Sequence, residues 1–238
     1  MDVLLCIVHL PSKLCWSGES QALECTHLAR IIREVEARVR HERTVLVGDL
    51  NMNPFEAGVV GAAGFNATMA RQVASRGSRS VQGERYPFFY NPMWGHFGDH
   101  RGNAGGSYYY DSGQHVNYYW NVFDQVLVRP ELIPRFPVEE LRIIASTPSR
   151  TLLSQQGRPD ARVASDHLPL LSKRTNHKLR GAVETTNYRR RLVHTFCIVA
   201  PSLDDYRYEL FMVSHGVMPY PVEVMIAPKD VKIPPPRS

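Results

Sequence analysis

Four times along the chain, a short apolar run of strand length leads into polar or ionisable residues. Such a run is typical of a buried strand, and its polar residues then lie at the end of a sheet, where open sites are usually built. The pattern therefore predicts a sheet protein whose site residues gather at strand ends. The four motifs are Val8-His9-Leu10-Pro11-Ser12-Lys13, Gly48-Asp49-Leu50-Asn51-Met52-Asn53-Pro54, Asn121-Val122-Phe123-Asp124-Gln125-Val126-Leu127-Val128 and Ser165-Asp166-His167-Leu168-Pro169-Leu170.

Between the first two motifs, the sequence predicts a strand, a long helix and a second strand. The first strand is Val3–His9, and the apolar residues of Glu19–His41 recur at helical spacing. Opposite charges four residues apart, as in Arg30/Glu34 and Glu36/Arg40, are expected on the outer surface of the helix. The β-branched segment Thr44–Val47 follows as a strand, so the expected fold class is α/β, with helices layered on a sheet.

The middle of the chain alternates between loops and strands. The stretch from Gly98 to Asn117 has a loop composition, Tyr118–Val128 and Leu141–Ala145 read as strands, and Thr147–Arg162 reads as a loop. Six aromatic residues could stack nucleobases or contact lipid, but aromatic strands more often belong to a core, which is the favoured interpretation. They are Tyr108, Tyr109, Tyr110, Tyr118, Tyr119 and Trp120.

The pattern changes after Leu171, which divides the chain into three predicted parts. Residues 1–172 form the motif-bearing domain, with 17 Lys and Arg against 17 Asp and Glu. Residues 173–191 are a basic linker with seven basic side chains against Glu184 alone, and residues 192–238 are a small β-rich appendage without an assigned role. Because the charges of the first part cancel, a strong non-specific nucleic-acid binder is not favoured.

Composition excludes a disordered chain and a membrane-spanning chain. The hydrophobic content of 43% is enough for a core, and the apolar start of the chain is too short for a spanning helix. That start also lacks the features of a secretion signal, so the expected location is cytoplasmic. The four cysteines form no C-x-x-C pair and are expected to be reduced thiols.

The four motifs, in this order, resemble those of the endonuclease/exonuclease/phosphatase family of divalent-metal phosphoesterases. The resemblance implies a DNase I-like layered α/β sandwich, of which residues 1–172 cover the second half. The first half of the family's domain, whose Glu is the main metal ligand, has no counterpart here. A second half alone is expected to expose the sheet face that packs against the first half in the complete domain. A complementing N-terminal half is therefore an expected partner.

Two of the motifs supply the expected centre of the chemistry. Asp49 and Asn51 lie two residues apart at a strand end and can converge on one face. The resemblance implies that Asp49 orients or deprotonates the attacking water, while Asn51 contacts the phosphate or its metal. It also implies that Asp166 helps to hold Mg²⁺ or Mn²⁺, and that His167 hydrogen-bonds the scissile phosphate or transfers a proton. Taken singly, these motifs would read as exposed turns.

The other two motifs supply supporting residues. Asp124 lies in a strand that looks buried, and a buried carboxylate needs a partner; the family pairs it with the residue that is His167 here. His9 resembles the second active-site His of the branch that includes DNase I and the neutral sphingomyelinases, as a general acid or phosphate donor. Asn121 and Lys13 are weaker candidates for substrate contacts.

Two function classes remain open from the sequence. The first is a metal-dependent phosphodiester or phosphomonoester hydrolase acting on nucleic acid, a phospholipid head group or a small molecule. The second is a non-catalytic remnant that serves as a binding or interaction module. The resemblance favours the hydrolase, and the missing metal-binding Glu leaves the activity of this chain alone undecided.

Overall fold

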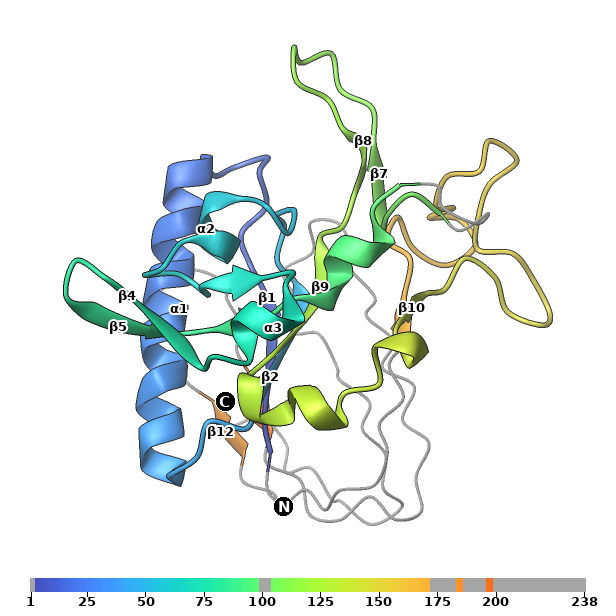
Figure 1. Ribbon diagram of the computed structural model, residues 1–238. Helices are drawn as coiled ribbons and strands as arrows, with labels where there is room; N and C mark the ends of the chain where they lie inside the picture. The colour runs from blue at the N-terminus through green and yellow to red at the C-terminus, as the bar shows by residue number, and fades with distance from the viewer. Residues whose placement is uncertain (1–2, 99–103, 172–182, 186–195, 199–238) are drawn as a thin grey trace, which may run out of the picture.

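A computed structural model of the chain describes residues 3–98, 104–171, 183–185 and 196–198. These residues form a mixed α/β fold around a seven-stranded mixed sheet of order β12-β13-β1-β2-β9-β6-β3. Figure 1 shows α1 on one side of this sheet and η3 with β10 on the other. The expected α/β class is therefore confirmed.

The first third of the described chain is the predicted strand, helix and strand. Strand β1 (Leu4–His9) pairs in parallel with β2 (Thr44–Asp49), from Leu4 opposite Thr44 to His9 opposite Asp49. Helix α1 (Gly18–Val39) connects them. It begins after Ser17, whose hydroxyl accepts from the Ser20 N–H, and it ends at Arg40 in the left-handed conformation. Both strand ends thus deliver their last residues to one edge.

Gly48 lets strands β1 and β2 approach each other closely, next to the pair formed by His9 and Asp49. A Cβ atom on this residue would lie 1.8 Å from the backbone oxygen of Val8, and the backbone has φ of 152°. Only glycine fits such an approach. The close contact brings the ends of β1 and β2, with His9 and Asp49, into the same corner of the sheet.

The remaining strands complete the sheet from distant parts of the chain. Strand β9 (Asp124–Val128) runs antiparallel to β2, and β6 (Phe89–Tyr90) with β3 (Ala67–Thr68) forms one edge. At the other edge, β12 (Val183–Thr185) and β13 (Phe196–Ile198) extend the same sheet beyond β1. The predicted linker and appendage thus contribute strands to the main sheet, and their other residues lie outside the described part of the chain.

Shorter elements connect and cover these strands. They are α2 (Ala57–Val60), α3 (Arg71–Ala74), β4 (Ser78–Val81), β5 (Glu84–Pro87), η1 (Pro92–His96), β7 (Tyr108–Tyr110), β8 (Tyr119–Asn121), η3 (Pro130–Arg135), η4 (Val138–Glu140), β10 (Arg142–Ile143) and β11 (Leu170–Leu171). Within the described residues, no helix combines the length and the apolar content needed to cross a bilayer. Among the described residues, Cys15 and Cys25 form no disulfide.

Apolar side chains cover both faces of the central strands. On one face, Leu28 and Ile32 of α1 pack with Cys6, Val8 and Leu46. On the opposite face, the buried residues come from β1, β2 and β9 together with the later segments. They include Ile7, Val47, Val126, Leu132, Phe136, Leu141 and Leu170. Among the described residues, the sheet face that was expected to be exposed is therefore largely covered, although Leu5 and Val45 on it are partly exposed.

Glu36 is not on the outer surface of α1, as the helical spacing predicted, but is buried against the sheet. Its carboxylate receives two hydrogen bonds from Arg129, from Nε at 2.8 Å and from Nη2 at 3.0 Å. Arg129 also donates to the carbonyls of Pro87 and Phe88 and stacks on the Phe89 ring at 3.9 Å. Both charged groups are over 95% buried, and the hydrogen bonds to their partners offset the free-energy cost of removing them from water.

The predicted strand Tyr118–Val128 is broken at Val122 and Phe123 into β8 and β9. Strand β8 pairs with β7 in a two-stranded hairpin that projects from the body in Figure 1. The prediction that the aromatic cluster is core is therefore wrong, because Tyr108, Tyr109 and Trp120 are only partly buried and the other three are more exposed. Tyr110, Tyr118 and Tyr119 are about half exposed, at 47%, 54% and 49%.

Candidate active site

The end of the β1, β2 and β9 strands brings three of the predicted site residues together. In the sheet register, Asp49 lies opposite His9 on one side and opposite Asp124 on the other. Asp49 and Asp124 are fully buried, whereas 45% of the His9 side chain is exposed. His9 Nε2 lies 3.5 Å from Asp49 Oδ2. The site thus opens to solvent on the His9 side.

Asp124 and His167 form a buried pair, as the resemblance implied. Asp124 Oδ2 lies 2.7 Å from His167 Nδ1, and the His167 side chain is 5% exposed. A carboxylate bonded to Nδ1 fixes the orientation of the ring and leaves Nε2 for another partner.

Ser107 holds the two members of this pair in place, and the sequence reasoning missed it. The Ser107 hydroxyl accepts from the Asp124 N–H at 3.1 Å, and its carbonyl accepts from the Leu168 N–H at 2.7 Å. The Ser165 hydroxyl accepts from the His167 N–H at 3.1 Å. Ser107 is fully buried. The sequence offers one signal for it, since Gly105 and Gly106 precede it and permit a close backbone approach.

Asn51 positions Asp49. Its backbone N–H donates to Asp49 Oδ1 at 2.8 Å, and its Nδ2 donates to Asp49 Oδ2 at 3.2 Å and to the Leu10 carbonyl at 2.9 Å. The Asn51 backbone has φ of 50°, a left-handed conformation that Asn tolerates better than most residues. Both oxygens of the Asp49 carboxylate are thereby oriented from one side.

The electrostatics of this cluster favour bound protons. Burial, and then the charge of Asp124, raise the pKa of Asp49 to about 7, although His167 and the Asn51 N–H act in the opposite direction. Burial alone would lower the pKa of His167, but its hydrogen bond to Asp124 and the surrounding carboxylates outweigh burial and raise this pKa to about 9. His167 is therefore an imidazolium at neutral pH.

The same residues offer a donor set for a divalent cation. One ligand atom each from Asp49, Asp124 and His167 lie within 4.8 Å of one another, and because an imidazolium cannot bind a cation, the two carboxylates are the donors. Asp124 Oδ1 is buried and has no hydrogen-bond partner among the residues that the structure describes. A buried carboxylate oxygen without a partner is costly, and a hard cation is the partner that carboxylates prefer. The donor chemistry therefore fits Mg²⁺ or Mn²⁺.

Asp166, the predicted metal ligand, is not a member of this three-residue group. It is partly exposed, and its charge raises the pKa values of both Asp49 and His167. It therefore lies beside the cluster and adds a third carboxylate to its surroundings.

Lys13 and Asn121, the weaker candidates, make contacts within the fold. Lys13 Nζ donates to Gln21 Oε1 at 3.2 Å and forms an ion pair with Glu56. Asn121 is buried, and its Oδ1 accepts from Asn53 Nδ2 at 2.8 Å. These contacts link the loops around the site and occupy the groups that were expected to reach substrate.

The protonated cluster has a measurable consequence for stability in a chelating buffer. The pKa of His167 in the folded state lies above the ordinary 6.5. The contribution of His167 to the free energy of unfolding is therefore complete below about pH 6.5 and is lost as the pH rises through about 9. The raised pKa of Asp49 acts in the same direction between about 3.8 and 7. We expect the melting temperature to fall from pH 6.5 to pH 9, and to fall less in His167→Gln. The matched control is the exposed His27→Gln, and equal slopes in all three proteins would contradict the assignment.

Comparison of the chain with protein-family models, with curated proteins and with solved structures gives no match. The chemistry of this protein is therefore inferred from the geometry of the site.

Proposed function

We propose that this chain is a metal-dependent phosphoester hydrolase with a DNase I-like arrangement of its site. The observation that carries the proposal is the buried Asp124–His167 pair beside Asp49, with Asp49 and Asp124 opposite each other in the sheet. Three of the four sequence motifs supply these three residues, and the fourth supplies His9. A structural ion pair would not need this convergence of separate motifs on one corner.

His167 is suited to stabilising the charge of the reacting phosphate. Asp124 holds Nδ1, and Nε2–H of the imidazolium is then available to donate to a phosphoryl oxygen as negative charge develops on it. The buried setting strengthens such a hydrogen bond relative to water. His9, half exposed at the mouth of the site, is placed to contact the same phosphoryl group.

Asp49 is suited to receiving the proton of the attacking water. A group whose pKa lies near the working pH is the most effective general base, and the pKa of Asp49 is about 7. The two hydrogen bonds from Asn51 fix the direction of the carboxylate. In the reaction, the water oxygen bonds to phosphorus, its proton passes to Asp49 and the bond from phosphorus to the ester oxygen breaks.

A divalent cation, held by Asp124 Oδ1 with Asp166 nearby, would supply neutralisation of the phosphoryl charge and would leave the Asp49 carboxylate to take the proton of water. The carboxylates of Asp124 and Asp166 supply the oxygen ligands and the negative charge that such a cation prefers.

Hydrolysis of bis(4-nitrophenyl) phosphate by the purified chain tests the proposal. We expect release of 4-nitrophenolate in Mg²⁺ or Mn²⁺, and its loss in excess chelator and in Asp49→Asn. The control is Asp160→Asn, which changes a carboxylate in the 147–162 loop. A folded chain that releases no product under any of these conditions would overturn the proposal and favour the non-catalytic binding module.

A further inference from the structure

A row of aromatic rings leads from His167 to the surface. The Tyr108 ring lies 4.5 Å from the His167 ring, 5.3 Å from Phe123 and 6.3 Å from Tyr110, measured between centroids. The Tyr108 plane is within 22° of Phe123 and within 11° of Tyr110. Phe123 is buried, Tyr108 is partly exposed and Tyr110 is 47% exposed. We refer to Phe123, Tyr108 and Tyr110 as the aromatic row.

The projecting hairpin holds this row in a fixed position relative to the site. Tyr108 and Tyr110 are two residues apart on β7 and so share one face. Tyr108 also forms an isolated bridge with His167 itself. Backbone pairing therefore fixes the position of the aromatic row relative to the His167 ring.

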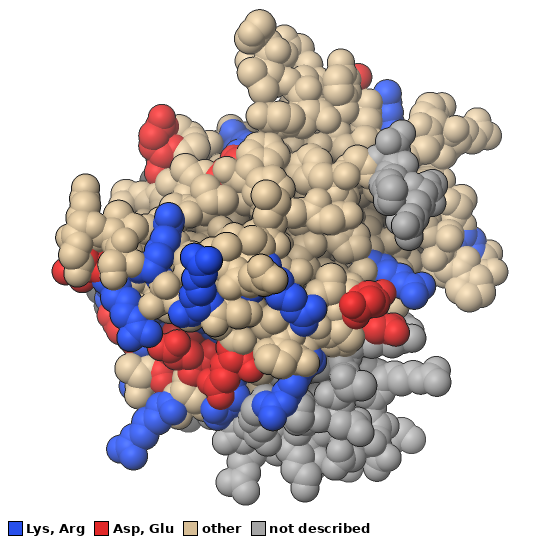
Figure 2. Space-filling view, in the orientation of Figure 1, with Lys and Arg blue, Asp and Glu red and all other residues tan. Residues whose placement is uncertain are grey.

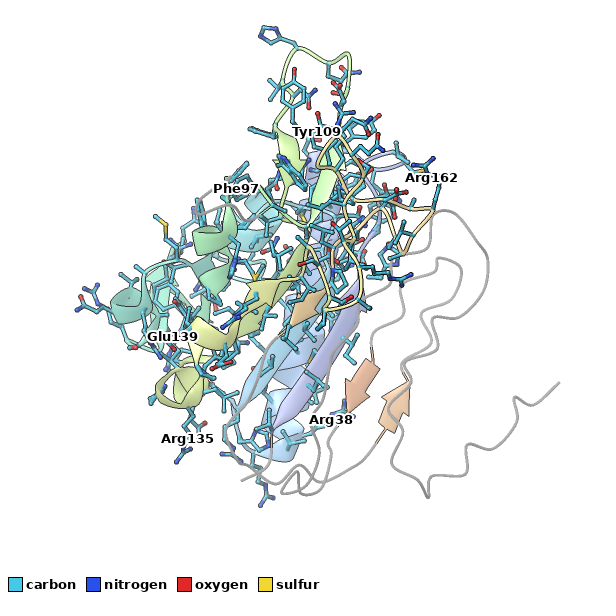
Figure 3. The ribbon with its side chains drawn as sticks, turned by 90° about the vertical axis from the view of Figure 1, so that its right-hand side faces the viewer. Arg38, Phe97, Tyr109, Arg135, Glu139 and Arg162 are labelled. Carbon is cyan, nitrogen blue, oxygen red and sulfur yellow. The ribbon has the colours of Figure 1, made fainter. Side chains whose placement is uncertain are left out.

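The opposite face of the hairpin is covered by its own strand β8 and by the loop that carries Arg158. Tyr109 packs edge-on against Trp120, with centroids 5.3 Å apart, and the guanidinium of Arg158 lies 4.3 Å from the centre of the Tyr109 ring. Figure 3 shows Tyr109 on the stem of the hairpin, with the loop that carries Arg162 beside it. Because these contacts occupy the back of the stem, the face with the aromatic row is, among the described residues, the one available to a ligand.

The composition of the hairpin distinguishes between a planar ligand and a membrane. A membrane-inserting tip presents apolar side chains at its end, but the tip here is Asp111-Ser112-Gly113-Gln114-His115-Val116-Asn117, with one apolar side chain. The aromatic rings lie on the stem instead, and two of them are nearly parallel. In Figure 2 the face of the hairpin in view carries mainly uncharged side chains. These features suit stacking of a flat ring more than insertion into lipid.

We propose that the aromatic row stacks a nucleobase of the substrate, so that the phosphodiester attached to that nucleoside lies at His167. This inference rests on the proposed function and narrows its substrate class to nucleotide phosphodiesters with an unpaired base. Stacking on aromatic side chains is tolerant of base identity, because every base has a flat π surface. The row would therefore select a nucleotide over an abasic phosphoester without reading sequence.

Binding in chelator tests this proposal without requiring hydrolysis. The probes are adenosine 5′-monophosphate and ribose 5-phosphate, titrated into the full chain and followed by NMR. We expect the nucleotide to bind about tenfold more tightly than the sugar phosphate, and Tyr110→Ala to remove that difference. Tyr110→Phe should retain it, and so should Tyr119→Ala, a matched loss of a half-exposed ring outside the row.

Three outcomes would overturn the inference. These are equal affinity for the two probes, equal loss of nucleotide binding in Tyr119→Ala and Tyr110→Ala, or sedimentation with phosphatidylcholine vesicles that Tyr110→Ala abolishes. Failure here is distinguishable from failure of the proposed function, because hydrolysis of bis(4-nitrophenyl) phosphate reports the chemistry and the NMR titration reports only the base.

Discussion

Replacing His167 by Ala is expected to lower kcat/KM for phosphodiester hydrolysis by about a hundredfold or more, in protein that circular dichroism shows to be folded. Loss of one preorganised hydrogen-bond donor to a developing charge costs roughly 10²- to 10³-fold in rate, and Asp124 holds His167 in such a position. Its side chain is buried beside Asp124, so the variant leaves that carboxylate without its partner. Initial rates in Mg²⁺ with the wild-type chain as reference give the effect.

The companion variant Asp124→Asn separates positioning from packing. Asn has the same shape but lacks the charge that favours the imidazolium, so we expect a fall mainly in kcat with little change in the circular dichroism spectrum. The matched control is His27→Ala, an exposed histidine on α1. If both His167→Ala and Asp124→Asn retained wild-type rates, the assignment of the site would be wrong.

Arg129→Met is expected to destabilise the fold by about 3–5 kcal/mol. The substitution leaves the Glu36 carboxylate buried without its two charge-assisted hydrogen bonds and also removes the donors to two carbonyls. Urea denaturation followed by circular dichroism gives the free energy of unfolding.

Two further variants separate the buried ion pair from ordinary surface charge. Adding Glu36→Leu to Arg129→Met removes the stranded carboxylate and should recover part of the loss. Arg30→Met breaks the exposed pair with Glu34 on the same helix and should cost well under about 1 kcal/mol. Equal losses in Arg129→Met and Arg30→Met would mean that burial does not govern this pair.

The sequence predicts the elements around the site well, because each depends on local pattern. Continuous apolar runs identify β1 and β2, and helical spacing identifies α1. The site follows from the motifs in the same way, since residues at the ends of adjacent strands must lie together. His9, Asp49 and Asp124 are therefore found at one corner, and His167 joins them.

What the sequence does not predict depends on partners that are distant along the chain. Glu36 has a surface spacing, yet its partner is 93 residues away at Arg129. The aromatic strands could have formed core or surface, since alternation alone does not say which face is covered. Ser107 has no motif of its own, and its role follows only from the two segments that its backbone and hydroxyl join.

The order of strands in the sheet also has a consequence for when the site forms during folding. The unit β1, α1 and β2 is local in sequence, so its ends can meet early and at small entropic cost. Strand β9 begins 75 residues after β2 ends, and the His167 loop arrives 43 residues later still. Asp49 therefore has no neighbouring carboxylate until these late contacts form. In a refolding experiment, the recovery of catalysis should lag behind the return of helical signal, and the length of that lag would time the docking of β9.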